Sequence, residues 1–134
     1  MKKRLLFVCV ENSCRSQIAE AFARIHGGGD IEAYSAGSRP SGRVNPKAIE
    51  TMNEIGYDLS THVSKSLDDI PQGTFDFVAT MGCGDECPVV PGLSRDDWPL
   101  DDPRGKSLAD VRLIRDEIRR RVADLLERQG WSGV

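Results

Sequence analysis

The sequence predicts one α/β domain spanning residues 1–134, built on a four-stranded parallel sheet with helices on both faces. Three observations favour this fold class. Strand-like apolar runs alternate with amphipathic helix-like segments, an order typical of parallel α/β folds. The run over residues 4–9 is almost wholly apolar, as expected of a strand buried on both faces. A chain of 134 residues is also the right size for one hydrophobic core.

The expected elements follow one another as strands at 4–9, 31–35, 75–81 and 98–100, helices at 15–26, 46–55 and 107–128, and a helical turn at 66–70. In the first helix, Ile18, Phe22 and Ile25 share one apolar face, and glycines 27–29 end it. The pair Asn45-Pro46 starts the second helix, because Asn is a good N-cap and Pro suits the first helical position.

The last helix is the longest, and its apolar stripe recurs at helical spacing through Val111, Ile114, Ile118, Val122 and Leu125. Between the third and fourth strands, residues 82–97 are rich in glycine and charge, and we expect an irregular loop there. Because the strands are expected to be parallel, their carboxyl ends lie at one edge of the sheet, and ligands bind at that edge in folds of this class.

Composition and charge argue against several classes of function. The net charge of −3 favours neither nucleic-acid nor membrane binding, and no apolar stretch approaches the length of a membrane span. The apolar run after the basic N-terminus is too short for a signal peptide. Cysteines 9, 14, 83 and 87 do not resemble a secreted disulfide framework, so we expect a cytoplasmic protein.

The arginine-rich stretch at 112–121 has a plain interpretation. Asp116 with Arg120 and Glu117 with Arg121 are spaced for ion pairs on one solvated helix face, which disfavours a nucleic-acid surface. His26 and His62 are isolated in the sequence, and we expect both to be structural or surface residues.

Cys9 ends the first expected strand, and Arg15 opens the next helix after five intervening residues. A thiol that attacks an oxyanion needs this arrangement, because loop and helix N–H groups bind the anion and favour the thiolate. The planar guanidinium of Arg15 can bind two oxygens at once. The alternative is a buried structural cysteine near a surface arginine. The whole pattern favours a catalytic Cys9.

The segment Cys9-x-x-Asn12-x-Cys14-Arg15-Ser16 resembles the signature loop of low-molecular-weight protein tyrosine phosphatases and of the arsenate reductases that share their fold. Residues 34–37, 44–48, 87–88, 98 and 101–106 also resemble the thioredoxin-coupled arsenate reductase branch, in matching order. The resemblance implies a phosphatase-like fold.

The same resemblance implies a set of substrate-binding residues, namely Val10, Glu11, Asn12, Ser13, Cys14 and Arg15. Asn12 tolerates left-handed backbone and can brace a tight loop. Ser16 can hydrogen-bond the Cys9 thiolate. The family commonly has glycine where Glu11 stands. A carboxylate that pointed into the anion site would repel the substrate, so we expect the Glu11 side chain to point outward. We expect Cys14 to be a packed residue at the start of the helix.

Cys83 and Cys87 lie four residues apart in a glycine-containing loop after the third expected strand. Two other interpretations compete with a redox pair: half of a zinc site, and two inert buried thiols. By resemblance to three-cysteine arsenate reductases, Cys9, Cys83 and Cys87 would act as the nucleophile, the second thiol and the final thiol. Cys83 and Cys87 are closer together than the corresponding cysteines of such enzymes, which leaves open which reductant regenerates the enzyme.

Asp102 precedes Pro103, and a residue before proline has a restricted, extended backbone. Displacement at an oxyanion needs a proton donor for the leaving oxygen. The family match places that general acid at Asp102, with Asp101 as the alternative, and an ordinary Asp-Pro turn is the non-catalytic interpretation.

Some family members bind potassium beside the loop, at positions matching Asn12, Glu20, Ser35 and an acid near residue 65. Lys65 stands there in this chain, so we expect no metal and expect its ammonium group to take the place of the cation. No cofactor is expected.

The resemblance therefore implies reduction of arsenate to arsenite, with thioredoxin or a low-molecular-weight thiol with a glutaredoxin-type protein as reductant. The alternative is a low-molecular-weight protein tyrosine phosphatase. Phosphotyrosine-specific members usually carry aromatic residues after the Asp-Pro pair, whereas this chain has Arg104-Gly105-Lys106. A third possibility is a non-catalytic oxyanion or metal sensor.

Overall fold

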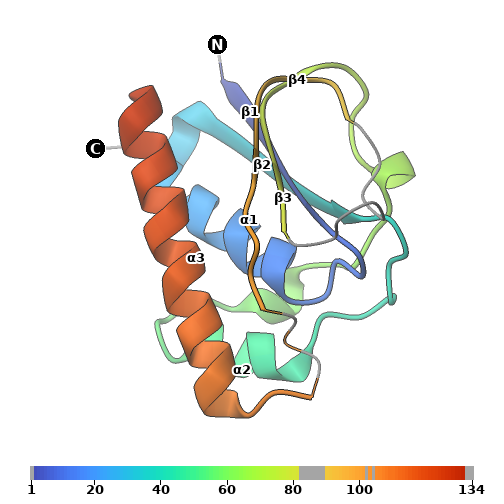
Figure 1. The fold of residues 1–134 in the computed structure, drawn as a ribbon, viewed down its shortest axis with the longest axis vertical. Coiled ribbons are helices and arrows are strands. Elements are labelled where there is room, and N and C mark those ends of the chain that lie inside the picture. The colour runs from blue at the N-terminus through green and yellow to red at the C-terminus, as the bar shows by residue number, and fades with distance from the viewer. Residues whose placement is uncertain (1, 82–89, 102, 104, 132–134) are drawn as a thin grey trace.

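The computed structural model describes residues 2–81, 90–101, 103 and 105–131. Its centre is a four-stranded sheet in the order β2-β1-β3-β4, and every neighbouring pair is parallel (Figure 1). The strands are β1 (Lys3–Cys9), β2 (Ile31–Gly37), β3 (Phe75–Thr80) and β4 (Gly92–Asp97). Cys9 pairs with Gly37 and Val8 with Thr80, so the carboxyl ends of three strands lie together.

In the described part of the chain, three α-helices accompany the sheet: α1 (Arg15–Gly27), α2 (Pro46–Asn53) and α3 (Leu108–Gln129). Three short 3₁₀ turns lie between the strands: η1 (Gly28–Asp30), η2 (Leu59–Thr61) and η3 (Leu67–Asp69). The predicted four-stranded parallel α/β sheet is confirmed.

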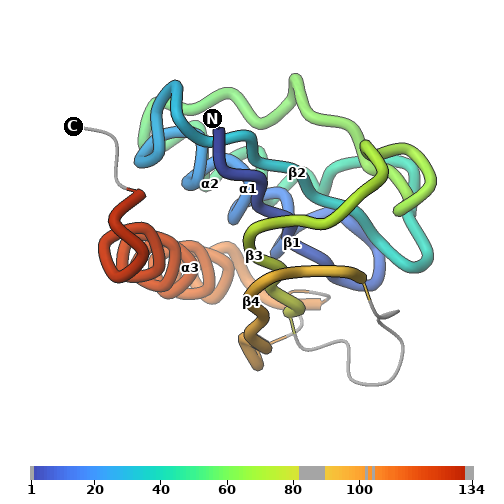
Figure 2. The backbone as a smooth tube through the Cα atoms, turned by 90° about the horizontal axis from the view of Figure 1, so that it is seen from above, coloured from blue at the N-terminus to red at the C-terminus, as the bar shows by residue number. Residues whose placement is uncertain are grey.

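The two faces of the sheet are covered differently. Successive side chains of a strand point to opposite faces. Leu5, Phe7 and Cys9 of β1 join the larger core, which includes the buried stripes of α1 and α3. Figure 2 shows these helices on the same side of the sheet. Leu6 and Val8 face the other way, into a smaller core closed by the segment around η3. Within the described residues, all three α-helices therefore cover one face, and where helices were expected on both faces the other has only the 3₁₀ turn η3.

Local signals explain where the helices begin. The Asn45 side chain accepts a hydrogen bond from the Lys47 backbone N–H at 2.8 Å, and Pro46 follows as the first helical residue of α2, as predicted. Ser107 caps α3 by accepting from the Asp110 N–H at 3.2 Å. Gly130 ends α3 with a φ of 73°, a conformation that glycine adopts without strain.

The fourth strand lies elsewhere than the sequence predicted. It spans Gly92–Asp97, inside the stretch expected to be a loop, and residues 98–100 follow it as non-strand. β4 is an edge strand whose side chains are mostly exposed and polar, so it lacks the apolar run that marks a buried strand. Trp98 is buried because it packs beneath the sheet against Phe7 and Phe77.

Two smaller expectations are also corrected. Ile25 was expected on the buried face of α1, yet it is 47% exposed, because the continuous run of buried residues in this helix ends at Ala23. The second helix ends at Asn53 rather than near residue 55, and a turn then leads to Gly56.

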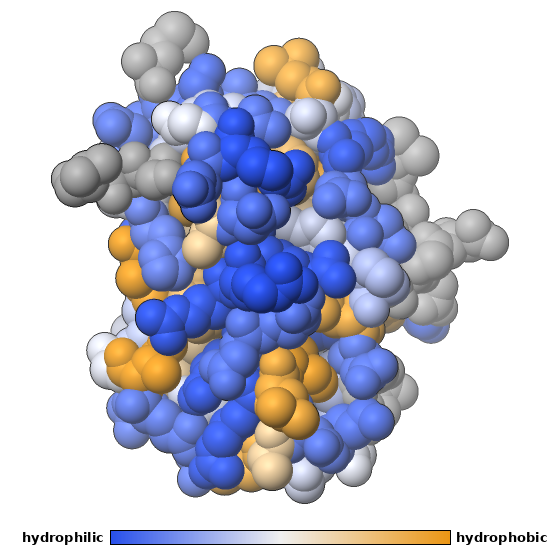
Figure 3. All heavy atoms as spheres, turned by 60° about the vertical axis from the view of Figure 1, so that its left-hand side comes forward, coloured by the Kyte–Doolittle hydropathy of each residue, from blue (hydrophilic) through white to orange (hydrophobic). Residues whose placement is uncertain are grey.

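The outer face of α3 carries its own ion pairs. Glu117 pairs with both Arg120 and Arg121, whereas Asp116 pairs with Arg115 and not, as predicted, with Arg120. Figure 3 brings this side of the molecule forward and shows a mainly hydrophilic surface with scattered apolar atoms. Within the described part of the chain, no helix is long and apolar enough to cross a membrane.

Candidate oxyanion-binding site

Cys9 and Arg15 stand at the two ends of a short loop between β1 and α1. Cys9 is the last residue of β1 and is 2% exposed, and Arg15 is the first residue of α1. The Arg15 Nη1 atom donates to the carbonyl oxygens of Met81, at 2.8 Å, and Leu100, at 3.4 Å. These bonds hold the guanidinium over the carboxyl ends of the central strands, where ligands bind in folds of this class.

The loop over residues 10–14 is held in place by hydrogen bonds that its carbonyl oxygens accept. Backbone N–H groups of residues 38, 39, 41 and 45 donate to the carbonyl oxygens of residues 9, 10, 11 and 13, at 3.3, 2.8, 3.0 and 2.8 Å. The Ser64 hydroxyl also donates to the Glu11 oxygen at 3.0 Å. The N–H of a trans peptide lies opposite its carbonyl group, so these bonds direct the loop N–H groups to the other side. That side, at the N-terminus of α1, suits an anion.

Gly37 permits this close approach of the loop to β2. A Cβ atom at Gly37 would lie 2.6 Å from the Val10 oxygen and 2.9 Å from the Asn12 nitrogen. Neither backbone atom could move aside cheaply. Glycine is therefore required at this position by the packing of β2 against the loop.

The Cys9 sulfur lies in a hydrogen-bonded cluster. Its Sγ is 2.8 Å from the Ser16 Oγ, which accepts a bond from the Asn12 Nδ2 at 2.8 Å. Asn12 has a φ of 50°, the left-handed conformation that the sequence led us to expect. Asn12 and Ser16 are fully buried, and Cys14 is packed at the start of α1 as predicted. The geometry thus brings Ser16 and Asn12 to Cys9.

Lys65 brings a positive charge beside a buried carboxylate. Its Nζ lies 3.5 Å from Glu20 Oε1 and 3.3 Å from Ser35 Oγ, and that hydroxyl donates to Glu20 at 2.6 Å. Arg24 also pairs with Glu20, at 2.8 Å. A metal ion does not fit beside Glu20 and Ser35, because it would meet the Lys65 ammonium group at short range.

Gln17 and His62 lie behind the loop, and the sequence gave no functional role to either. Gln17 is fully buried, and its Nε2 donates to Asn12 Oδ1 at 2.8 Å. His62 was expected to be a structural or surface residue, and its side chain is only 3% exposed and contacts Gln17, which fits the structural alternative. Burial lowers the pKa of His62 below its ordinary value of 6.5, although Glu20 opposes that shift. A polar residue next to Ile18 in a buried helix stripe was the available signal for Gln17.

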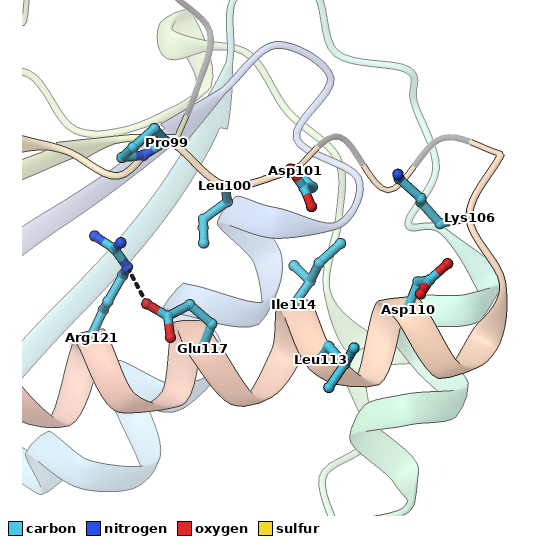
Figure 4. A pocket seen from close by; sticks show the side chains of 9 residues that line it. All are labelled: Pro99, Leu100, Asp101, Lys106, Asp110, Leu113, Ile114, Glu117 and Arg121. Carbon is cyan, nitrogen blue, oxygen red and sulfur yellow. Dashed lines mark hydrogen bonds and ion pairs between the residues drawn. The ribbon is translucent and has the colours of Figure 1, made fainter.

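A cavity of about 380 Å³ adjoins this region (Figure 4). Leu100 and Asp101 line one side of it, and Leu113 and Ile114 of α3 line the other. The residues of the 9–15 loop do not line the cavity, so it is a neighbour of the oxyanion loop and not the loop itself. Leu100 belongs to both regions, because it lines the cavity and its carbonyl oxygen accepts a hydrogen bond from Arg15.

Three residues that the sequence singled out lie outside the described part of the chain, namely Asp102, Cys83 and Cys87. Their expected roles stay predictions. Asp101, the alternative acid, is exposed and lines the cavity.

Comparison with known proteins gives a consistent picture. The chain is 42% identical to arsenate reductase 2 of Staphylococcus saprophyticus over 90% of its own length and 94% of the relative. It is 40% identical to arsenate reductase 1 of Staphylococcus haemolyticus, over 94% of this chain and 96% of the other.

Solved structures agree. A structure described as an arsenate reductase in the phosphate binding state superposes with a TM-score of 0.84 at 37% identity, covering 94% of this chain and 98% of that one. The thioredoxin-dependent arsenate reductase of Corynebacterium glutamicum gives a TM-score of 0.79 at 38% identity, covering 95% of this chain and 61% of that one. The family profile for low molecular weight phosphotyrosine protein phosphatase matches residues 4–130. The chain therefore belongs to the low molecular weight phosphotyrosine protein phosphatase family.

Proposed function

We propose that this protein is an arsenate reductase that uses Cys9 as its nucleophile. The observation that carries the proposal is the Cys9–Arg15 loop, formed at the carboxyl edge of the sheet in a chain 42% identical to an arsenate reductase. A loop of this kind binds a tetrahedral oxyanion through backbone N–H groups and a guanidinium. The proposal includes a cytoplasmic location, where thiols stay reduced.

In the first step, arsenate binds to the N–H groups of residues 10–14 and to Arg15. The Cys9 thiolate attacks arsenic, a sulfur–arsenic bond forms, and one oxygen leaves as water after Asp102 has supplied a proton. Ser16, 2.8 Å from the sulfur, stabilises the thiolate before the attack.

In the second step, the thiolate of Cys83 attacks the Cys9 sulfur. A Cys9–Cys83 disulfide forms, the electron pair of the sulfur–arsenic bond stays on arsenic, and arsenite leaves. Cys87 then attacks Cys83, which frees Cys9 and forms a Cys83–Cys87 disulfide. An external dithiol reduces that disulfide. Thioredoxin is the favoured reductant, since one relative is described as thioredoxin-dependent, and a low-molecular-weight thiol with a glutaredoxin-type protein is the alternative.

The second candidate is a phosphatase, which the family match favours. The same loop would bind a phosphate ester, Cys9 would form a phosphoryl intermediate, and water would hydrolyse it. Cys83 and Cys87 would then have no role in turnover, because phosphoryl transfer requires no electrons.

Cys83→Ser and Cys87→Ser separate the two functions. Both variants should lose multiple-turnover arsenate reduction and keep aryl-phosphate hydrolysis at the parent level, whereas Cys9→Ser should lose both activities. After one turnover, mass spectrometry should detect a Cys9–Cys83 disulfide in the Cys87→Ser protein. The Cys83→Ser protein should release no arsenite.

Full arsenate turnover by both variants would overturn the relay, and rapid aryl-phosphate hydrolysis without arsenate reduction by the parent would establish the phosphatase instead. Thioredoxin with its reductase, compared with glutathione and glutaredoxin, identifies the reductant in the same assay.

A further inference from the structure

We propose that Lys47 is a positioning residue that holds the acid segment, residues 100–107, in place relative to the oxyanion loop. Its ammonium group donates to the backbone carbonyl oxygen of Lys106, which is 59 residues further along the chain. The inference rests on the proposed function, because it takes the proton donor of the first step to be Asp102, within this segment. It adds a residue of α2, an element to which the proposed reaction gives no role.

The N-terminus of α2 is already attached to the oxyanion loop. The Asn45 backbone N–H donates to the Ser13 carbonyl oxygen at 2.8 Å. The Asn45 side chain caps the helix by accepting from the Lys47 backbone N–H at 2.8 Å. Lys47 is therefore two residues from a group that binds the loop, and the cap fixes its backbone. A side chain that reaches from here to another segment joins that segment to the loop.

Helix stability does not account for a lysine at this position. A helix N-terminus carries a partial positive charge, so a cation in the first turn is unfavourable. Lys47 stands in the first turn of α2, half-buried, between Pro46 and Ala48. Its contact with Lys106 gives the ammonium group a use there, because a partly buried backbone carbonyl needs a donor.

The acid segment is attached at both of its ends. At one end, the Arg15 Nη1 atom donates to the Leu100 carbonyl oxygen at 3.4 Å. At the other end, the Lys106 carbonyl oxygen accepts from Lys47. Asp102 lies in the sequence between these two attachments. Loss of the Lys47 contact leaves the segment attached to the site at Leu100 alone.

A tight turn connects the Lys106 attachment to the residue that follows Asp102. The Lys106 N–H donates to the Pro103 carbonyl oxygen at 3.1 Å, which closes the turn. Pro103 is buried, and Gly105 has a φ of 73°, a conformation that glycine adopts without strain. A turn of this shape carries the constraint at the Lys106 oxygen back to Pro103, and so to its neighbour Asp102.

Proton transfer makes this placement important. A general acid works within hydrogen-bond reach of the oxygen that leaves. A displacement of about 1 Å in a catalytic group has effects of about 10²-fold on the rate. The oxyanion loop determines where the leaving oxygen lies, and the acid segment determines where the proton donor lies. Lys47, which is joined to both, constrains the distance between them.

A second link between α2 and α3 supplies a matched control. Just beyond the last residue of α2, the Glu54 carboxylate pairs with Arg112 at 2.7 Å and with Arg115 at 2.9 Å. This cluster joins the two helices at the opposite end of α2 from Lys47. Glu54→Gln therefore weakens the contact between α2 and α3 and leaves the attachment at Lys106 intact.

Amide hydrogen exchange tests the attachment without any substrate. Lys47→Met keeps the apolar stem and removes the donor, so exchange in a peptide covering residues 100–107 should rise by about three- to tenfold, the effect of one lost hydrogen bond. Lys47→Arg keeps a cationic donor and should stay closer to the parent, and Glu54→Gln should match the parent in this peptide. Equal exchange in Lys47→Met and the parent would overturn the inference.

Kinetics test the consequence for proton transfer. Phenyl phosphate has a poor leaving group that needs a general acid, whereas 2,4-dinitrophenyl phosphate has a good one that does not. Lys47→Met should lower kcat/KM by about tenfold for arsenate and for phenyl phosphate, part of the usual contribution of a general acid. The value for the dinitrophenyl ester should stay within about twofold of the parent. Equal losses for both esters would indicate a merely structural role and would overturn the inference.

A double-mutant cycle shows whether Lys47 acts through Asp102. In the Asp102→Asn protein the proton donor is already absent, so adding Lys47→Met should lower kcat/KM for phenyl phosphate by no more than about twofold. The full tenfold loss in that background would overturn the inference. A parent protein that reduces no arsenate would instead contradict the proposed function, and the exchange and ester measurements would still decide the role of Lys47.

Discussion

Gly37 shows how strongly one residue can constrain the oxyanion loop. β2 carries it opposite Cys9, and the loop peptides at Val10 and Asn12 pass so close that no side chain fits between them. The same contact brings residues 38–41 near enough to bind the loop carbonyl oxygens. Absence of a side chain is therefore as much a part of the site as the thiol and the guanidinium.

Gly37→Ala should lower kcat/KM for arsenate by about 10²-fold, because a displacement of about 1 Å in a binding loop has effects of this size. Gly29→Ala is the matched control, since a Cβ at Gly29 meets nothing within 4 Å. Steady-state kinetics of both variants, beside their thermal unfolding, measure the difference. Equal activities would show that the loop tolerates a methyl group at Gly37.

Helix α1 serves as both the anion-binding terminus and a core element. Its first residue is Arg15, and its buried stripe passes through Ile18 and Phe22 into the core shared with α3. Phe22 is 1% exposed and stacks on His26, with ring centroids 5.9 Å apart. Packing against β1, β2 and α3 holds the helix, and thereby its N-terminus, in place beneath the loop.

Phe22→Ala should lower the free energy of unfolding by about 3–5 kcal/mol, the usual cost of removing a buried ring. Ile25→Ala, one turn further along α1, should change it by less than about 1 kcal/mol because Ile25 is already 47% exposed in the folded protein. Urea titrations of the two variants measure this contrast. Similar losses in both would mean that Ile25 contributes to the core after all.

At the scale of the whole molecule, buried histidines link stability to pH. Burial lowers the pKa of His62 and of His26, and the charge of Arg119 adds to the effect at His26. Around His62, Arg24 and Lys65 lower its pKa further, while Glu20 and Asp58 raise it. The unfolded chain, where both histidines have ordinary values near 6.5, therefore binds more protons than the folded protein in mildly acidic solution.

Stability should accordingly be highest above the unfolded histidine value of 6.5 and should fall as the pH drops toward about 5. His62→Asn should flatten this dependence, and His26→Asn should do so too. Hydrogen bonds from arginines lower the pKa values of carboxylates such as Glu54 and Glu117. These carboxylates lose their contribution to the stability of the fold only at a pH below the range in which the histidines act. Unfolding free energies measured between about pH 5 and 8 test this dependence, and an unchanged slope in His62→Asn would contradict it.

The sequence by itself determined the features that lie close together along the chain. Cys9, Arg15 and the segment between them are contiguous, so a strand end, a tight loop and a helix start could be predicted from local pattern. The start of α2 at Asn45 and Pro46 was predictable for the same reason, because an N-cap acts within one turn. The apolar stripe of α3 is likewise a local periodicity.

Only the tertiary structure decided which distant residues support that loop. Gly37 and His62 approach it because β2 pairs with β1 and because the segment after η2 packs behind α1. Lys65 was expected beside the loop, but from the family resemblance and not from any local pattern. Strand β4 escaped prediction because edge pairing through the backbone leaves little trace in exposed side chains. Contacts across dozens of residues depend on how the elements pack, and packing is a property of the whole chain that no local pattern encodes.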